Sequence, residues 1–206
     1  MDSIMPGCSS SPIRRAAPGP RRRALTAALV AACVAAGLAR CADAAGIDIR
    51  RVETRLVDNV YWLDADIHYA FSHKTLKALN NGVPVTVQLD IEVTRQRRFL
   101  WDKKVATLEQ RYQLRYRALT RHYLLKNLNS ASEHVFPSLN SALAALGKVQ
   151  DLPVLDRSLL LAARGYTARM RVSLDIEALP VPLRLLAYFS PAWHLSSKWH
   201  QWSLGR

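Results

Sequence analysis

Histidine and acidic residues are the first candidates for chemistry in this chain, because imidazoles and carboxylates bind metals and transfer protons. Six histidines follow residue 44, and none has the H-x-H, H-x3-H or HExxH spacing that brings two imidazoles to one metal. They are His68, His73, His122, His134, His194 and His200. His68 shares the polar face of a predicted strand with Asp64 and Asp66, but such a face is more often simply solvated. We therefore predict no metal site and no cofactor.

Nucleophilic and acid–base catalysis have no recognisable signature either. The chain contains no G-x-S-x-G nucleophile elbow, and its three cysteines all precede residue 45. The carboxylate pairs Asp64/Asp66 and Asp175/Glu177 are two residues apart on predicted strands. Each pair then lies side by side on one face, whereas a glycosidase needs carboxylates that oppose each other across a cleft. We assign no catalytic residue and expect a protein that is not an enzyme.

Arginine is the more distinctive residue type. Arg111, Arg115 and Arg117 fall on the polar face of one predicted strand, and Arg169 and Arg171 on that of another. If these strands are neighbours, their guanidinium groups form a cationic sheet face that can hold an anion through forked hydrogen bonds. The alternative is a mixed-charge face, on which the arginines are neutralised by the carboxylates of Glu92, Glu109, Asp175 and Glu177.

The C-terminal stretch 180–202 is rich in aromatic and aliphatic residues, among them Trp193, Trp199 and Trp202. Tryptophan beside Arg184 and Lys198 suits a membrane interface or stacking against a sugar. A final strand whose indoles close the core would produce the same pattern, and we favour that interpretation. The alternative hypothesis is that the three tryptophans form a second binding surface.

Period-two alternation of apolar and polar residues dominates after residue 44 and predicts half-buried strands of antiparallel sheets. It is clearest over residues 61–71, 83–94, 108–117 and 166–177. Residues 47–56 are predicted to form a further strand that turns at Asp58-Asn59 into the next one as a hairpin. Shorter strands are expected at 123–128 and 135–136.

Two short helices interrupt this pattern. Ser72 and Gly82 bound the first predicted helix, and Ser138 and Gly147 bound the second. Each has about two turns and must lie against a sheet to be stable. The expected fold is mainly β, as an antiparallel β-sandwich or a strongly curved sheet with two short covering helices.

The first 44 residues resemble an export leader. Arg21-Arg22-Arg23 precede the sixteen-residue apolar run Ala24–Ala39, and Ala42-Asp43-Ala44 fits a cleavage site with small residues. The run is shorter than a typical membrane span, so we predict a cleaved signal peptide over 1–44 and a single β-rich domain over 45–206. Retention of the leader as an anchor is the alternative. The expected location is the periplasm, either free or peripheral to the membrane.

The chain is strongly basic, with a formal net charge of +13. Residues 45–206 keep 23 basic and 14 acidic side chains, a net charge of +9. A basic exported domain is expected to meet anionic lipid, a cell-wall polymer or an acidic envelope protein rather than nucleic acid.

Several motifs in the chain resemble, in this order, the proteobacterial family called domain of unknown function 4390. They are Asn81-Gly82-Val83-Pro84, Arg97-Arg98-Phe99-Leu100-Trp101-Asp102, Arg111-Tyr112-Gln113-Leu114-Arg115-Tyr116, Phe136-Pro137-Ser138-Leu139, Asp175-Ile176-Glu177, Pro180-x-Pro182-Leu183-Arg184 and Trp193-x-Leu195-Ser196-Ser197-x-Trp199. The resemblance covers nearly all of the chain after residue 44. It implies an exported protein of uncharacterised role and brings no catalytic residues.

Together these observations predict an exported, non-enzymatic protein that binds an anionic or envelope partner through its arginine-bearing face. An envelope hydrolase whose site has no sequence signature is the alternative. A purely structural accessory to a membrane protein complex is the third interpretation.

Overall fold

A hairpin begins the described part of the chain. The computed structural model describes residues 45–95, 102–160 and 165–204, and these form one compact unit. Strands β1 (Gly46–Val57) and β2 (Val60–Ala70) are joined by Asp58-Asn59, whose φ angles are 50° and 65°. Asp and Asn tolerate this left-handed conformation, which suits the twist of a two-residue hairpin turn. The predicted hairpin is confirmed, and β7 (Lys148–Asp156) pairs with β2 to complete a three-stranded antiparallel sheet.

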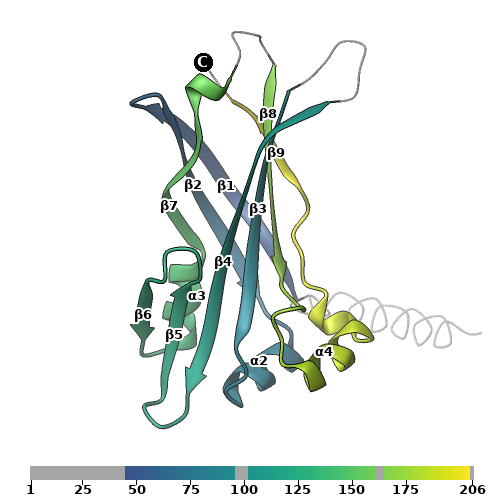
Figure 1. Ribbon diagram of the computed structural model, residues 1–206. Helices are drawn as coiled ribbons and strands as arrows, with labels where there is room; N and C mark the ends of the chain where they lie inside the picture. The colour runs from purple at the N-terminus through teal and green to yellow at the C-terminus, as the bar shows by residue number, and fades with distance from the viewer. Residues whose placement is uncertain (1–44, 96–101, 161–164, 205–206) are drawn as a thin grey trace, which may run out of the picture. The chain divides into compact units, whose positions relative to one another are not determined.

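Six strands form a second antiparallel sheet in the order β6-β5-β4-β3-β8-β9 (Figure 1). Their bounds are Val85–Arg95 for β3, Lys103–Arg117 for β4, His122–Asn127 for β5, Glu133–Phe136 for β6, Tyr166–Leu174 for β8 and His200–Ser203 for β9. Strand β3 pairs with β4 on one side and with β8 on the other. This central position brings together the polar faces of the two arginine-bearing strands on either side of β3.

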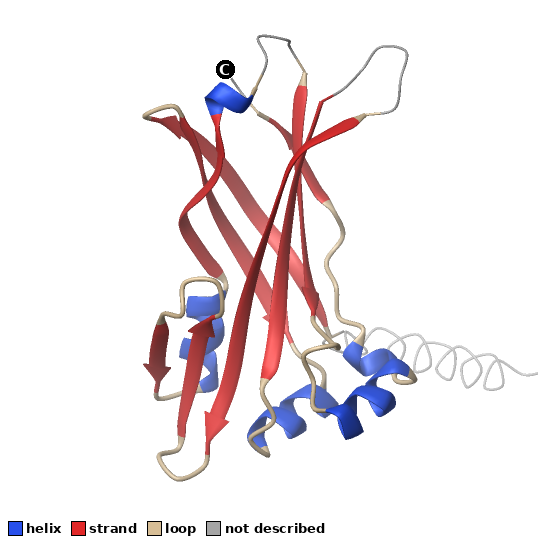
Figure 2. Cartoon of the chain, viewed as in Figure 1, coloured by secondary structure: helices blue, strands red, loops and turns tan. Residues whose placement is uncertain are grey.

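The helices among the described residues are short and lie near the ends of the strands (Figure 2). Helix α2 (His73–Asn80) begins where the Ser72 side chain accepts a hydrogen bond from the Thr75 amide at 3.1 Å. Helix α3 (Leu139–Leu146) begins with a capping box between Ser138 and Ser141. Helix α4 (Val181–Tyr188) begins after Pro180. No helix in this part of the chain combines the length and apolar character needed to cross a bilayer.

Glycine is needed at the two predicted helix ends for different physical reasons. Gly82 follows α2 with a φ of 84°, the left-handed conformation expected of a glycine stop. Gly147 ends α3 with a φ of −75°, which other residues also adopt. Its role is to allow close approach, because a Cβ at this position would lie 2.3 Å from the carbonyl oxygen of Ile67. The Gly147 carbonyl accepts a hydrogen bond from the Ile67 amide at 2.8 Å, so this contact joins the end of α3 to β2.

The two sheets share one hydrophobic core. The inward residues of β2, among them Leu63 and Ile67, belong to the same buried cluster as Leu89 on β3 and Met170 on β8. The helices add buried side chains to this cluster, namely Leu79, Ala142, Leu146 and Ala187. The apolar phase predicted for each long strand is therefore the buried phase, and two sheets around one core confirm the predicted mainly β fold.

Two features of the fold differ from the sequence prediction. The described residues contain nine strands, because β7 and β9 add to those expected from alternation. Strand β7 was missed because its alternation is broken at Asp151, whose φ is 51°. The stretch 180–202 was expected to be a final strand, whereas it forms α4, the 3-10 helix η2 (Pro191–Trp193) and only then β9. Pro180 and Pro182 cannot donate to a sheet, but both are tolerated where a helix begins.

The alternation on β3 predicts unequal effects for two neighbouring residues. Leu89 is 2% exposed in the core, whereas Gln88 lies on the polar face and donates a hydrogen bond to Asp90 at 2.7 Å. We expect Leu89→Ala to lower the free energy of unfolding by about 3 kcal/mol, through lost burial and a new cavity. Gln88→Ala should lower it by less than about 1 kcal/mol. Urea unfolding of the full chain measures both, and equal losses would show that the strand is buried on both faces.

Candidate functional site

The predicted arginine face is the outer face of the six-stranded sheet, and its central strand is acidic. Across the β3–β8 pairing, Glu92 is opposite Arg169 and Asp90 is opposite Arg171. Across the β3–β4 pairing, Gln88 is opposite Arg111. The two arginine-bearing strands are therefore not direct neighbours, since β3 places carboxylates between them.

The arginines of β8 are bound to these carboxylates. Arg169 donates from Nε to Oε2 of Glu92 at 2.8 Å, and Lys104 donates from Nζ to Oε1 of the same side chain at 2.6 Å. Arg171 contacts Asp90 at 3.3 Å. Glu92 is only 9% exposed, so its carboxylate depends on these cationic donors. On this half of the face the mixed-charge arrangement accounts for the arginines.

The carboxyl group of Glu92 is electrostatically stabilised as an anion. Burial acts to raise its pKa, but hydrogen bonds from Lys104 and Arg169 outweigh burial and hold the pKa below the ordinary value of 4.5. A lowered pKa means that folding is stabilised above the ordinary pKa, and that this contribution is lost as the pH falls through the folded-state value.

Trp199 adds an aromatic contact to the same arginines. The guanidinium carbons of Arg169 and Arg171 lie 4.6 Å and 4.7 Å from the centre of its ring. Cation–π contacts at this range hold the two guanidinium groups in place while they also bind carboxylates. The arginine face and the aromatic terminus were predicted as two separate sites. In the structure they meet at Trp199.

The other two tryptophans lie against the core. Trp193 is buried, and Trp202 is half-buried on β9 opposite Ala168, packed against the same hydrophobic core. These positions agree with the core-closing interpretation of the C-terminal stretch.

The arginines of β4 are less fully neutralised. Arg111 bonds to Glu109 on its own strand, and Arg117 lies 3.7 Å from Glu133 on β6. Arg115 is exposed and has no acidic partner among the described residues. Lys126, on the same face of β5, is opposite Glu133 of β6, whose ion pair is with Arg117. We call Arg111, Arg115, Arg117 and Lys126 the Arg115 patch.

A surface depression borders the Arg115 patch. Its volume is about 250 Å³, and it is lined by Arg117, Thr120, His122, Leu124 and Val135. Leu124 is buried on this outer face and supplies an apolar floor beside the cations. Lys126, His122 and this floor come from β5, whose short length gave no alternation long enough to identify them from the sequence.

Four carboxylates were expected to neutralise the arginines of this face, and only two of them contact these arginines. Glu92 and Glu109 do so, and Asp90 joins them. Asp175 instead accepts from the Ala178 amide at 3.2 Å, and Glu177 accepts from the Tyr188 hydroxyl. Both lie after the end of β8, where strand alternation no longer determines which way a side chain points.

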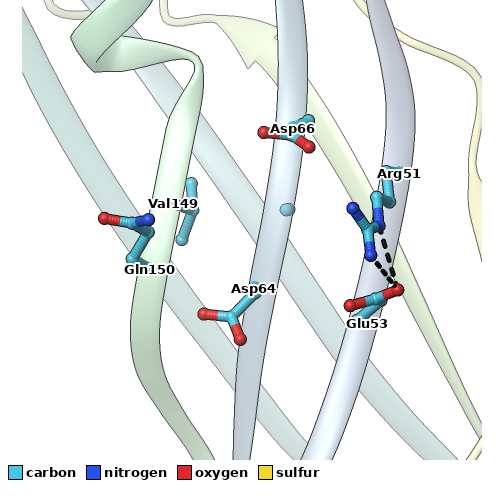
Figure 3. A pocket seen from close by; sticks show the side chains of 7 residues that line it. Arg51, Glu53, Asp64, Asp66, Val149 and Gln150 are labelled. Atoms are coloured by element: carbon cyan, nitrogen blue, oxygen red, sulfur yellow. Dashed lines mark hydrogen bonds and ion pairs between the residues drawn. The ribbon is translucent and has the colours of Figure 1, made fainter.

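The face with His68, Asp64 and Asp66 is the outer face of the three-stranded sheet. Figure 3 shows a small pocket there, with Asp64 and Asp66 on β2 and an ion pair between Arg51 and Glu53 on β1. Its volume is about 170 Å³. Asp64 bonds to Arg55 and accepts from the Asp151 amide at 2.9 Å. Within the three described ranges, no group of histidine and acidic side chains is arranged to hold a metal.

The network at Glu92 generates a pH-dependent stability prediction. We expect Glu92→Gln to lower the free energy of unfolding by about 2 kcal/mol at neutral pH, because Arg169 and Lys104 lose a charged acceptor. The difference from the wild type should shrink as the pH falls from about 5 to about 3, where the native carboxyl is protonated. Urea unfolding at several pH values measures it. As a control, Glu109→Gln on the exposed pair should change stability by no more than about 0.5 kcal/mol. A Glu92→Gln difference that persists at low pH would contradict the assigned charge.

Comparison with known proteins identifies the family of this chain, but the description of that family names no activity. The model of the family described as domain of unknown function (DUF4390) matches residues 44–203. No curated protein and no solved structure gives a significant match. The match covers most of the chain and both sheets of the structure. The chain therefore belongs to the DUF4390 family, as its motifs predicted.

Proposed function

We propose that this protein is a non-enzymatic accessory protein of the cell envelope, which binds an anionic partner through the Arg115 patch. The observation that carries the proposal is Arg115, an exposed guanidinium with no acidic partner among the described residues. Arg117 is on the same face of β4, and Lys126 is on the same face of the neighbouring β5. Guanidinium groups close together favour phosphate and carboxylate groups, which they bind through paired hydrogen bonds.

The β8 half of the predicted face has a different role in this proposal. Arg169 and Arg171 already bind Glu92 and Asp90 and contact Trp199. A partner would have to replace these contacts before it could use either guanidinium group, which makes the β8 arginines structural. The proposed binding site is thereby narrowed from five arginines on two strands to the arginines of β4 and Lys126 on the neighbouring β5.

The residue types of the Arg115 patch are better explained by a role in binding than by a requirement of folding. Arg115 is exposed on an alternating strand, where threonine or glutamine would serve the sheet equally well. The net charge of +9 over residues 45–206 also favours anionic partners such as lipid, a cell-wall polymer or an envelope protein. An envelope hydrolase is kept as the alternative hypothesis.

Charge reversal tests the Arg115 patch. We expect Arg115→Glu with Lys126→Glu to abolish the salt-sensitive co-sedimentation of the full chain with purified peptidoglycan and to lower its salt-sensitive co-sedimentation with phosphatidylglycerol vesicles. The melting temperature should change little, because exposed charges contribute at most about 1 kcal/mol each. Arg50→Glu with Lys148→Glu, which makes the same charge change on the three-stranded sheet, is the matched control. Undiminished retention of the Arg115 variant on both probes, or an equal loss in the control, would show that the site lies elsewhere.

Export is a separate part of the proposal, and it rests on the leader-like sequence of residues 1–44, which lie outside the described residues. We expect the form found in the cell to begin at Ala45 and to fractionate with the periplasm or the outer membrane surface. Intact-mass measurement of the fractionated protein decides this. Recovery of the whole 206-residue chain in the inner membrane would instead identify the leader as an anchor.

A further inference from the structure

Helix α4 exposes apolar side chains to solvent. Val181, Leu185, Leu186, Tyr188 and Phe189, which we call the α4 surface, account for half of the exposed large hydrophobic side chains among the described residues. Leu186 is 67% exposed and Phe189 is 89% exposed. Positions 181, 185 and 189 follow at intervals of four, so they share one side of the helix. Scattered exposed leucines are ordinary, but a contiguous apolar patch on a soluble domain marks an interaction surface.

The α4 surface is held outward by burial of Ala187 and by polar contacts of Arg184 and Tyr188. Ala187 is fully buried in the core. Arg184 donates to the carbonyl oxygen of Leu179 at 3.1 Å and lies 3.6 Å from Glu177, which also accepts from the Tyr188 hydroxyl. These bonds fix the rotation of the helix about its axis. The apolar side chains therefore cannot turn into the core without breaking them.

Cations lie beside the α4 surface. Lys74 and Lys77 are exposed on α2, and Nζ of Lys74 donates to Oγ of Ser190, just after α4, at 3.2 Å. Helices α2 and α4 both pack against η2. Helix α2 has no acidic residue, and the nearby Glu177 is already bound to Arg184 and Tyr188. An apolar centre with a cationic border is complementary to a bilayer with anionic headgroups.

The chain enters the domain at the same end. Gly46, the first residue of β1, pairs with Ala70, which is followed by Phe71, Ser72 and then α2 (Figure 1). Until the predicted cleavage after Ala44, the sixteen-residue apolar run Ala24–Ala39 is joined covalently to the end of the domain that carries the α4 surface. A single weak membrane contact gives marginal binding, and two contacts on one chain reinforce each other.

We propose that the α4 surface docks on an anionic lipid bilayer, with Leu185, Leu186 and Phe189 inserted among the lipids and Lys74 and Lys77 at the headgroups. A second copy of this chain fits the surface less well. A symmetric dimer through α4 would bring the lysines of both copies close together, and like charges repel. The inference does not depend on the Arg115 patch, which lies on β4 and β5.

The test uses the full chain with Leu29→Asp and Val34→Asp in every sample, so that the apolar run no longer binds membranes by itself. Co-sedimentation with vesicles of phosphatidylcholine and phosphatidylglycerol is compared between this parent and Leu186→Asp with Phe189→Asp. We expect the α4 variant to lose at least about tenfold in partitioning, because two charges would enter the apolar layer. Val57→Asp with Leu159→Asp, at exposed apolar positions elsewhere in the domain, should stay within about twofold of the parent.

The remaining samples separate the contributions. Lys74→Glu with Lys77→Glu should weaken retention on phosphatidylglycerol vesicles and leave the weaker retention on pure phosphatidylcholine unchanged. Equal retention of the parent and the α4 variant would overturn the inference. So would an absence of vesicle binding together with a dimer, seen by analytical ultracentrifugation, that the α4 variant dissociates. Arg115→Glu with Lys126→Glu tests the Arg115 patch in the same assay, so the two proposals can fail independently.

Discussion

Strand β3 lies between β4 and β8, and both faces of the six-stranded sheet depend on its alternation. Its apolar side chains, such as Leu89 and Ile91, form the middle of the core and meet β2 of the opposite sheet. Its polar side chains, Asp90 and Glu92, lie on the outer face between the two arginine-bearing strands. One strand therefore sets both the packing of the core and the charge balance of the surface.

This arrangement divides the arginines into two groups. Those on β8 face the carboxylates of β3 directly, and Trp199 covers them. Those towards the end of β4 extend beyond β3, where the sheet continues through β5 instead. At that point the acidic strand is no longer adjacent, so Arg115 has no carboxylate to bind within the described residues. Glu133, which is opposite Lys126 on β6, forms its ion pair with Arg117. Whether a guanidinium group is bound to a carboxylate or left free for a partner therefore depends on whether the neighbouring strand is acidic.

The C-terminal segment shows how burial is decided by the neighbours of a residue rather than by its type. Trp193 is buried because η2 lies on the core, and Trp202 packs on Ala168 because β9 pairs with β8. The apolar side chains of the α4 surface, by contrast, are exposed, because Arg184 and Tyr188 bind Glu177 and fix the helix with that side outward. Two of the tryptophans expected at an interface, Trp193 and Trp202, thus support the core, and the residues of the α4 surface beside them are exposed.

The sequence by itself determined the family, the mainly β class, the β1–β2 hairpin, two of the helices and the buried phase of each long strand. These depend on local signals: alternation, cap residues and turn residues act within a few positions along the chain. Strand order, the acidic neighbours of the arginines, the contact of Trp199 with Arg169 and Arg171, and the outward face of α4 were decided only by the tertiary structure. Each of these depends on which distant segments become neighbours, and alternation along one strand contains no information about the strand beside it.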